Sequence, residues 1–266
     1  MAISLCETFR SLAFSTHTQL AKGRRVGHQP LEETFTDLNI LELKDRHPSE
    51  IYSQTFSKRR EGVNGADWEW WLTNSSRSLW LGLRVQAKVL HLATDSFPHL
   101  HYKSGTPKTY QLSKLKSEAA RDGLFPIYCF YTHDTSLKAA SDLLCRSFSY
   151  VPESYGCALT STAHVANLQA AGEVHDLASV MSEAVPWHCL VCCTGYSRGG
   201  DLPTRASAYL KATFSGSESA GQDQGAGLEL RSRPPRHVID TLEGRETEEL
   251  PADVQGVIII APQDDD

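Results

Sequence analysis

The fold is decided by GADWEWW at residues 65–71 and LRVQAKVL at residues 83–90. In a β-strand, residues two apart share a face, so the two acidic residues of the first stretch point to the same side. Gln86 and Lys88 share a face in the same way, while the apolar residues around them point into a core. A lysine in the middle of an apolar strand is costly unless it has partners or a chemical role. The pattern therefore predicts a pair of strands that carries a polar site.

The same alternation has a second interpretation, because a half-buried strand often has one wet face. Asp67 and Glu69 would then be solvated, and Lys88 would be their cross-strand salt-bridge partner.

The tryptophans beside these carboxylates also have two interpretations. Trp68 and Trp70 could stack on nucleic-acid bases, but at alternating strand positions they are more typical of core packing.

Composition sets limits on the class of protein. The 266 residues allow one large or two small domains, and the net charge is -6. Residues 1–150 have 19 Lys and Arg against 15 Asp and Glu, whereas residues 151–266 have 7 against 17. A mildly basic first half is compatible with a phosphate backbone as partner but does not require one. No apolar run is long enough for a membrane span, and the start of the chain lacks the order of a signal peptide. We expect a cytoplasmic protein with no membrane association and with reduced cysteines.

Hydrophobic periodicity predicts alternating helices and strands. Helices are predicted at residues 1–14, 31–44, 110–121, 137–148, 165–171, 176–184 and 203–212, and strands at 51–58, 66–72, 79–90, 125–131, 156–162, 187–193 and 256–261. The strands at 51–58, 66–72 and 79–90 should form a meander. We expect a disordered loop near residues 215–250, which begins with a segment rich in Ser, Gly and Gln. The apolar strand 256–261 needs a sheet, so the C-terminal part should fold back onto the rest.

From residue 31 the predicted order of elements is α-β-β-β-α-β. In this order, and in its Asp67 and Gln86-x-Lys88 motifs, the chain resembles the PD-(D/E)XK, or restriction-endonuclease-like, nuclease superfamily. More narrowly it resembles the Mrr-type variants with a Gln-x-Lys signature, and the motifs also resemble those of uncharacterised bacterial proteins. The resemblance implies an α/β fold with a restriction-endonuclease-like core at residues 28–150. An N-terminal helix within residues 1–27 would pack on this core, and residues 151–266 would form a C-terminal α/β extension.

The resemblance also implies metal-dependent hydrolysis of phosphodiester bonds, with DNA as the default substrate. The cofactor would be Mg²⁺ or Mn²⁺, because such sites use one or two carboxylates together with phosphate oxygens. Asp67 would be the central ligand, and Gln86 would contribute its side-chain oxygen. Lys88 would position the attacking water or stabilise the developing charge. Glu33, on the first helix of the core, would complete the metal shell, and Glu69 is the alternative ligand.

Partners follow from the same resemblance. Lys108, Lys114 and Lys116 lie on or beside the helix after the Gln-x-Lys strand, where they would meet DNA phosphates; a solvated helix face is the other explanation. A small stand-alone nuclease would suit a bacterial defence or restriction role. Nucleases that cut both strands often dimerise, so we expect a homodimer, and any activating partner is unidentified at this stage.

Two other functions remain open. Ala66 stands where the superfamily has proline, and Gln86 is neutral, so the chain could be a catalytically inactive, nuclease-like binding module. The sequence GYSRG at residues 195–199 follows a predicted strand and precedes a predicted helix, which is the context of a nucleophile elbow. A serine hydrolase would then use Ser197 as the nucleophile, with His237 as the base that follows it in the chain.

Overall fold

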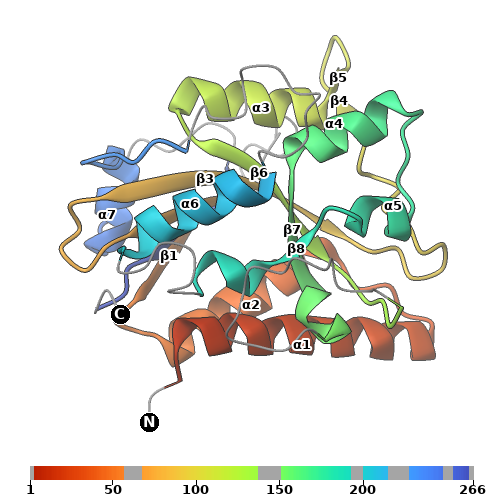
Figure 1. Cartoon of the computed structure of the whole chain (residues 1–266), viewed down its shortest axis with the longest axis horizontal. Helices are drawn as coiled ribbons and strands as arrows, with labels where there is room; N and C mark the ends of the chain where they lie inside the picture. Colours follow the sequence, from red (N-terminus) through yellow and green to blue (C-terminus); the bar gives the residue numbers. More distant parts are fainter. Residues whose placement is uncertain are drawn as a thin grey trace.

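The structure is a computed structural model that describes residues 3–56, 68–136, 151–192, 200–214, 228–247 and 254–263. Within these residues the chain has a mixed α/β fold built on a seven-stranded mixed sheet with helices on both of its faces (Figure 1). The expectation of an α/β fold is therefore confirmed.

The elements have the following bounds. The strands of the sheet are β1 (Ile51–Thr55), β2 (Trp68–Thr73), β3 (Trp80–Val89), β6 (Phe125–Tyr131), β7 (Cys157–Ser161), β8 (Val185–Pro186) and β9 (Gly256–Ile260), and a separate hairpin pairs β4 (Lys103–Ser104) with β5 (Thr109–Tyr110). The α-helices are α1 (Leu5–Val26), α2 (Glu32–Arg46), α3 (Gln111–Asp122), α4 (Thr162–Ala170), α5 (Leu177–Met181), α6 (Leu202–Phe214) and α7 (Arg236–Leu242). Two 3₁₀ helices are η1 (Pro152–Gly156) and η2 (Trp187–Leu190).

The sheet has the strand order β1-β9-β2-β3-β6-β7-β8. Strands β2 and β3 pair antiparallel, as the alternation predicts, and β3 pairs parallel with β6. The predicted meander is wrong, because β9 lies between β1 and β2 and pairs with both. Every residue of β9 is buried, and a strand this apolar is stable only with neighbours on both edges and cover on both faces. Strands from both halves of the chain thus build one sheet.

The two faces of β2 and β3 have different chemistry. Trp70 is opposite Leu83 on one face, whereas Glu69 is opposite Arg84 on the other. Helices α1 and α2 cover the face of Trp70, below the sheet in Figure 1, and α3 covers the polar face from above. All the described tryptophans are buried in the core, so the core interpretation of Trp68 and Trp70 is confirmed.

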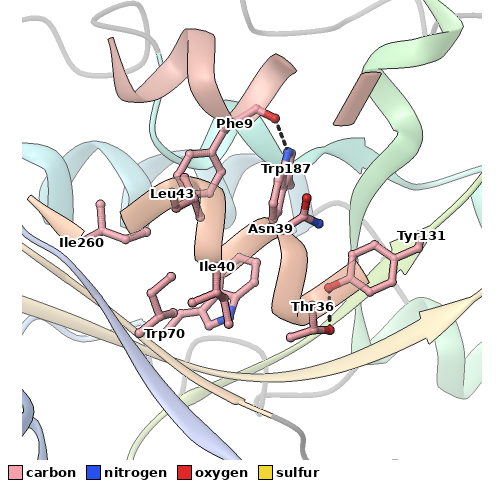
Figure 2. A pocket seen from close by; sticks show the side chains of 10 residues that line it. Phe9, Thr36, Asn39, Ile40, Leu43, Trp70, Tyr131, Trp187 and Ile260 are labelled. Atoms are coloured by element: carbon pink, nitrogen blue, oxygen red, sulfur yellow. Dashed lines mark hydrogen bonds between the residues drawn. The ribbon is translucent and has the colours of Figure 1, made fainter. Parts of the chain in front are cut away.

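Between α1, α2 and the sheet lies a small cavity, shown in Figure 2. Its volume is about 20 Å³, and its lining is mostly apolar. Its polar side chains include Asn39, Thr36 and Tyr131, and a hydrogen bond of 2.8 Å joins the hydroxyls of the last two. A volume of roughly 10–15 Å³ holds one water, so this space is a gap in the core and too small for a substrate.

Helix α1 is longer than the predicted helix at residues 1–14. Ser4 and Glu7 form a capping box at its start, and Gly27 ends it with a φ of 68° that favours glycine. Its C-terminal half continues because Thr16, His17 and Leu20 keep a buried face. Helix α1 packs against α2, β7, η1 and η2, which ties the N-terminal segment to both halves of the chain.

A disulfide joins Cys6 on α1 to Cys192, 186 residues further along the chain. The expectation that the cysteines are reduced is therefore wrong for this pair, because the fold brings two distant apolar segments together. The predicted strand at 187–193 is also wrong, since residues 187–190 form the 3₁₀ helix η2. None of the helices in the described part of the chain combines the length and the apolar character needed to cross a membrane.

Residues 228–247 fall within the loop that we expected to be disordered near residues 215–250, and that expectation is wrong for them. They include α7, and Trp80 forms an isolated β-bridge with Arg231. Val238 on α7 is fully buried, which explains why this short helix is held in place. Residues 215–227, and the predicted helix at 137–148, lie outside the described residues.

Candidate functional site

The motif residues of β3 lie at the carboxyl end of the strand. Lys88 is one residue before the end of β3 and pairs with Phe130 of the parallel strand β6. In open α/β sheets, ligands bind outside the carboxyl ends of parallel strands. The Gln86-x-Lys88 motif is therefore at the edge of the sheet where a ligand is expected.

Gln86 and Lys88 are both buried at this edge. The side-chain amide nitrogen of Gln86 donates a hydrogen bond of 3.1 Å to the main-chain oxygen of Ala87. The ammonium nitrogen of Lys88 lies 4.0 Å from a carboxylate oxygen of Glu32, and only 9% of the lysine side chain is exposed. A charge that is buried this deeply normally needs a close partner, and 4.0 Å is a loose contact.

Glu32 reaches Lys88 because the chain before α2 is tied to the end of β3. The side chain of Gln29 donates to the main-chain oxygen of Leu90 at 3.1 Å and accepts from the main-chain nitrogen of Leu92 at 2.8 Å. Helix α2 starts three residues later, so its first residue lies beside the carboxyl end of β3. The N-terminus of a helix also favours a carboxylate in its first turn.

Sequence reasoning chose Glu33, and the structure places Glu32 beside Lys88 instead. Glu33 is exposed, because neighbouring residues on a helix point about 100° apart. The buried face of α2 contains Phe35, Asn39 and Leu43. Glu32 precedes these residues at helical spacing, so the periodicity of the helix was the signal that could have identified it.

Asp67, the expected central ligand, lies outside the described residues. Among the residues that the structure does describe, no group of three or more His, Cys, Asp or Glu side chains could hold a metal ion. Within the described residues, the carboxylate that the structure brings into contact with Lys88 is that of Glu32. A site of the type that Mg²⁺ prefers would need a second carboxylate, and Asp67 is the residue expected to provide it.

A different ionic network surrounds Arg84, which is completely buried on β3. One guanidinium nitrogen lies 2.7 Å from Glu69 and 3.0 Å from Asp122, and another lies 3.5 Å from Glu118. Glu69 belongs to β2, whereas the other two carboxylates belong to α3. Arg84 thus joins two strands to the helix that covers them.

Glu69 has partners at both of its carboxylate oxygens. One oxygen accepts from Arg84, and the other accepts from Trp71 at 3.0 Å and contacts the Nε2 atom of His237 on α7 at 2.8 Å. Burial alone would raise the pKa of Glu69, but the contacts with His237, Arg84 and Trp71 outweigh it and hold the pKa below its ordinary value. In this structure Glu69 anchors α7 and α3 to the sheet, which leaves no oxygen without a partner for a metal.

The lowered pKa of Glu69 predicts a pH-dependent stability. A carboxyl group whose pKa is lower in the folded state stabilises the fold above its unfolded pKa, and this contribution is lost as the pH falls through the folded value. We expect the free energy of unfolding to fall as the pH drops below 4.5, the ordinary value for this group. Urea unfolding at a series of pH values, with Glu69→Gln beside the wild type, measures this. An identical pH dependence in both proteins would contradict the role of Glu69.

A larger hollow of about 510 Å³ lies near the same edge and was not identified from the sequence. It is lined by residues that follow β6 in the chain, including His133 and Asp134, together with Asp95, Asp176 and Arg24. Arg24 forms an ion pair with Asp95, and burial lowers the pKa of His133. Because carboxylates dominate its lining, this hollow does not suit a phosphate group.

The three lysines expected to meet DNA are close to the β4–β5 hairpin. Lys108 is exposed in the turn of the hairpin, and Lys116 is exposed on α3. Lys114 is partly buried and donates a hydrogen bond of 2.9 Å to the hydroxyl of Ser104. Two of the three are thus accessible to a polyanion, and the third supports the hairpin.

The alternative catalytic pair is Ser197 and His237, and the structure describes only the second of these residues. Ser197 and the rest of the GYSRG motif lie outside the described residues. The Nε2 atom of His237 is engaged by Glu69, which gives this histidine a structural partner on β2. The serine-hydrolase interpretation gains no support from the described contacts.

Comparison with known proteins gives a family but no activity. No curated protein and no solved structure matches the chain. A family described as a family of unknown function, DUF6615, matches residues 5–266, which is almost the entire sequence. The chain therefore belongs to the DUF6615 family.

Proposed function

We propose that this protein is a metal-dependent nuclease whose site lies at the carboxyl end of β3. The proposed residues are Asp67, Gln86 and Lys88, with Glu32 in place of Glu33. The order α2-β1-β2-β3-α3-β6 follows the α-β-β-β-α-β order of restriction-endonuclease-like proteins, with the β4–β5 hairpin inserted before α3. The insertion of β9 between β1 and β2 is a departure that leaves the β2–β3–β6 part of the order intact.

The observation that carries the proposal is the buried position of Lys88. Its ammonium group lies 4.0 Å from Glu32, beside Gln86, at the edge of the sheet where ligands are expected. Arg84, two strand positions before Gln86, has carboxylate oxygens at 2.7 Å and 3.0 Å and thus serves the fold. The loose contact of Lys88 is better explained by a group that acts on a ligand than by a second structural ion pair.

Each residue has a role in phosphodiester hydrolysis. A water attacks the phosphorus, the bond to the leaving oxygen breaks, and negative charge builds up on the phosphoryl oxygens. Lys88 would orient the water or stabilise that charge, in a position where burial strengthens its electrostatic effect. Glu32 holds the ammonium group at the edge and would, with Asp67, supply the carboxylates of the site. Gln86 would add a neutral oxygen.

Mg²⁺ or Mn²⁺ fits this donor set only when Asp67 is included, since the described residues of the set contribute one carboxylate. When bound, the ion would act as a Lewis acid on the phosphoryl group and lower the pKa of the water. DNA is the proposed substrate, and the exposed Lys108 and Lys116 would contact its backbone. The alternative function is an inactive binding module, because Gln86 is neutral. The experiment below distinguishes this function from that of a nuclease.

The metal dependence of plasmid nicking tests the proposal. Purified protein with Mg²⁺ or Mn²⁺ should nick or linearise supercoiled DNA, and EDTA should reduce the rate at least about a hundredfold. Asp67→Asn should cause a loss of the same size, because a single carboxylate would then remain for the metal. Lys211→Ala, at an exposed position on α6, is the control and should cut at the wild-type rate. A folded wild type that binds DNA but does not cut it with any metal would favour the binding module.

A further inference from the structure

The segment that leads from β3 into α3 is basic, although the chain as a whole is acidic. Residues 96–117 contain four lysines and no aspartate or glutamate, whereas the whole chain has 32 acidic residues against 26 lysines and arginines. This segment comprises the β4–β5 hairpin and the first half of α3, which pack together near the top of the molecule in Figure 1. A local excess of positive charge in an acidic protein attracts polyanions.

The charges of α3 itself are sorted between its two sides. Its acidic residues are Glu118 and Asp122, and they lie 3.5 Å and 3.0 Å from the guanidinium group of the buried Arg84. Lys116 and Arg121 are exposed, and Arg121 also pairs with Asp122. The acidic charge of the helix is thus largely used against the sheet, so α3 presents mainly positive charge to solvent.

Contacts on both faces hold the β4–β5 hairpin in place. On one face the ammonium nitrogen of Lys103 lies 4.2 Å from the ring centroid of Tyr110. Both residues contact the carboxylate of Glu173, the lysine at 3.4 Å and the tyrosine hydroxyl, which donates, at 2.6 Å. On the other face Lys114 donates to the hydroxyl of Ser104 at 2.9 Å. The hairpin is therefore preformed, and little ordering would be needed when a ligand binds to it.

Tyr102 is an exposed aromatic residue beside these lysines. It is 54% exposed at the base of the hairpin, where its main-chain oxygen accepts from the main-chain nitrogen of Gln111 at 2.9 Å. Residues two apart in an extended chain share a face, so Tyr102 is on the face of Ser104, to which Lys114 is attached. An exposed ring among ammonium groups can stack on a nucleic-acid base while the lysines contact phosphates.

We infer that the β4–β5 hairpin and the outer side of α3 bind single-stranded DNA, with Tyr102 stacked on a base and with Lys108 and Lys116 on phosphates. In a duplex each base is covered on both faces by its neighbours, so an aromatic side chain stacks on bases that are unpaired. Stacking on Tyr102 therefore selects an unpaired stretch of DNA. Negative supercoiling favours the opening of a duplex, so a supercoiled plasmid also offers such stretches.

This surface adjoins the proposed nuclease site. Gln86 and Lys88 alternate in step with Arg84, so they are on the face of β3 that α3 covers. The chain between β3 and the hairpin packs there too, because the ring centroid of Phe97 lies 4.7 Å from that of Phe130, the strand partner of Lys88. DNA held by the hairpin would thus lie close to the edge of β3. The choice of DNA rests on the proposed function, to which this surface adds the class of substrate.

Fluorescence anisotropy in EDTA, with a labelled oligothymidine of about 15 nucleotides, tests the inference without cleavage. The wild type should bind this single strand at least about fivefold more tightly than a duplex of the same length, which is the smallest gain expected from one stacked base. Tyr102→Ala should remove this gain, whereas Tyr102→Phe keeps the ring and should bind within about twofold of the wild type. Equal affinity for strand and duplex, or wild-type binding by Tyr102→Ala, would overturn the inference.

Two double variants matched in charge test the part of the lysines. Lys108→Ala/Lys116→Ala should weaken binding and reduce the slope of log K against log salt concentration by about 1.4, because each phosphate contact with a single strand contributes about 0.7. Lys44→Ala/Lys211→Ala removes the same charge from exposed positions on α2 and α6 and should keep the wild-type slope. The same change in both double variants would show that net charge alone matters, against the inference.

Binding and cleavage can fail separately. A protein that binds the single strand through Tyr102 in EDTA, but does not nick plasmid with any metal, would support this surface and refute the nuclease proposal. A protein that nicks plasmid through Lys88, but binds the single strand no better than the duplex, would refute this inference and leave the proposed function standing.

Discussion

Lys88→Met is expected to lower the rate of DNA cleavage at least about a hundredfold while leaving the stability of the protein nearly unchanged. Methionine keeps the length and apolar character of the lysine stem but removes the charge. Removing one partner of an ion pair is costly when the charge left behind stays buried and uncompensated. The carboxylate left behind, that of Glu32, is 23% exposed and can be hydrated. We therefore expect the free energy of unfolding to stay within about 1 kcal/mol of the wild-type value.

Two measurements on the same preparation separate a chemical role of Lys88 from a structural one. Urea unfolding gives the stability, and plasmid nicking gives the activity. A large loss of stability together with the loss of activity would mean that Lys88 holds the fold. Lys88→Arg adds a further check, because a positive charge with a different shape should recover only part of the rate.

Arg84→Met, unlike Lys88→Met, should destabilise the protein. We expect it to lower the free energy of unfolding by about 3–5 kcal/mol. This substitution removes the guanidinium group from the buried Glu69, which keeps only its contacts with Trp71 and His237, and it also removes the Arg84 contacts of Glu118 and Asp122 on α3. Breaking a buried ion pair from one side is far more costly than removing both partners, because the remaining charge is uncompensated. Denaturant unfolding, followed by circular dichroism, measures the loss.

Removing the opposing charge as well tests this explanation. In the Arg84→Met background, Glu69→Gln should restore part of the lost stability, because the charge that would be left uncompensated on β2 is gone. The difference between the single and double variants gives the coupling between the two residues. Additive effects, or a loss below about 0.5 kcal/mol for Arg84→Met, would show that the network does not hold α3 and α7 to the sheet.

Most of the helices and strands could be predicted from the sequence, whereas the place of β9 in the sheet could not. Period-two alternation gave β2 and β3, and it put Gln86 and Lys88 on one face. The apolar run that forms β9 indicates a buried strand, but burial alone does not specify its neighbours. Its insertion between β1 and β2 is a contact between segments about two hundred residues apart, and no local pattern encodes such a contact.

The same limit applies to the site. Glu32 and Glu33 differ by one position, and only the inward periodicity of α2 separates them. The contact between Glu69 and His237 joins residues separated by 168 positions, so the structural role of Glu69 could not be inferred from its place beside the motif. Sequence alone placed Glu69 with Asp67 on one face, where it looked like a second metal ligand.

The most direct test of the nuclease proposal is the initial rate at which Lys88→Met nicks supercoiled plasmid in Mg²⁺, compared with the wild type and Lys211→Met at equal concentrations of folded protein. The account predicts equal rates for the wild type and Lys211→Met, and a rate at least about a hundredfold lower for Lys88→Met. Metal-dependent nicking that proceeds at the wild-type rate in Lys88→Met would contradict it, because the activity would then come from another part of the molecule.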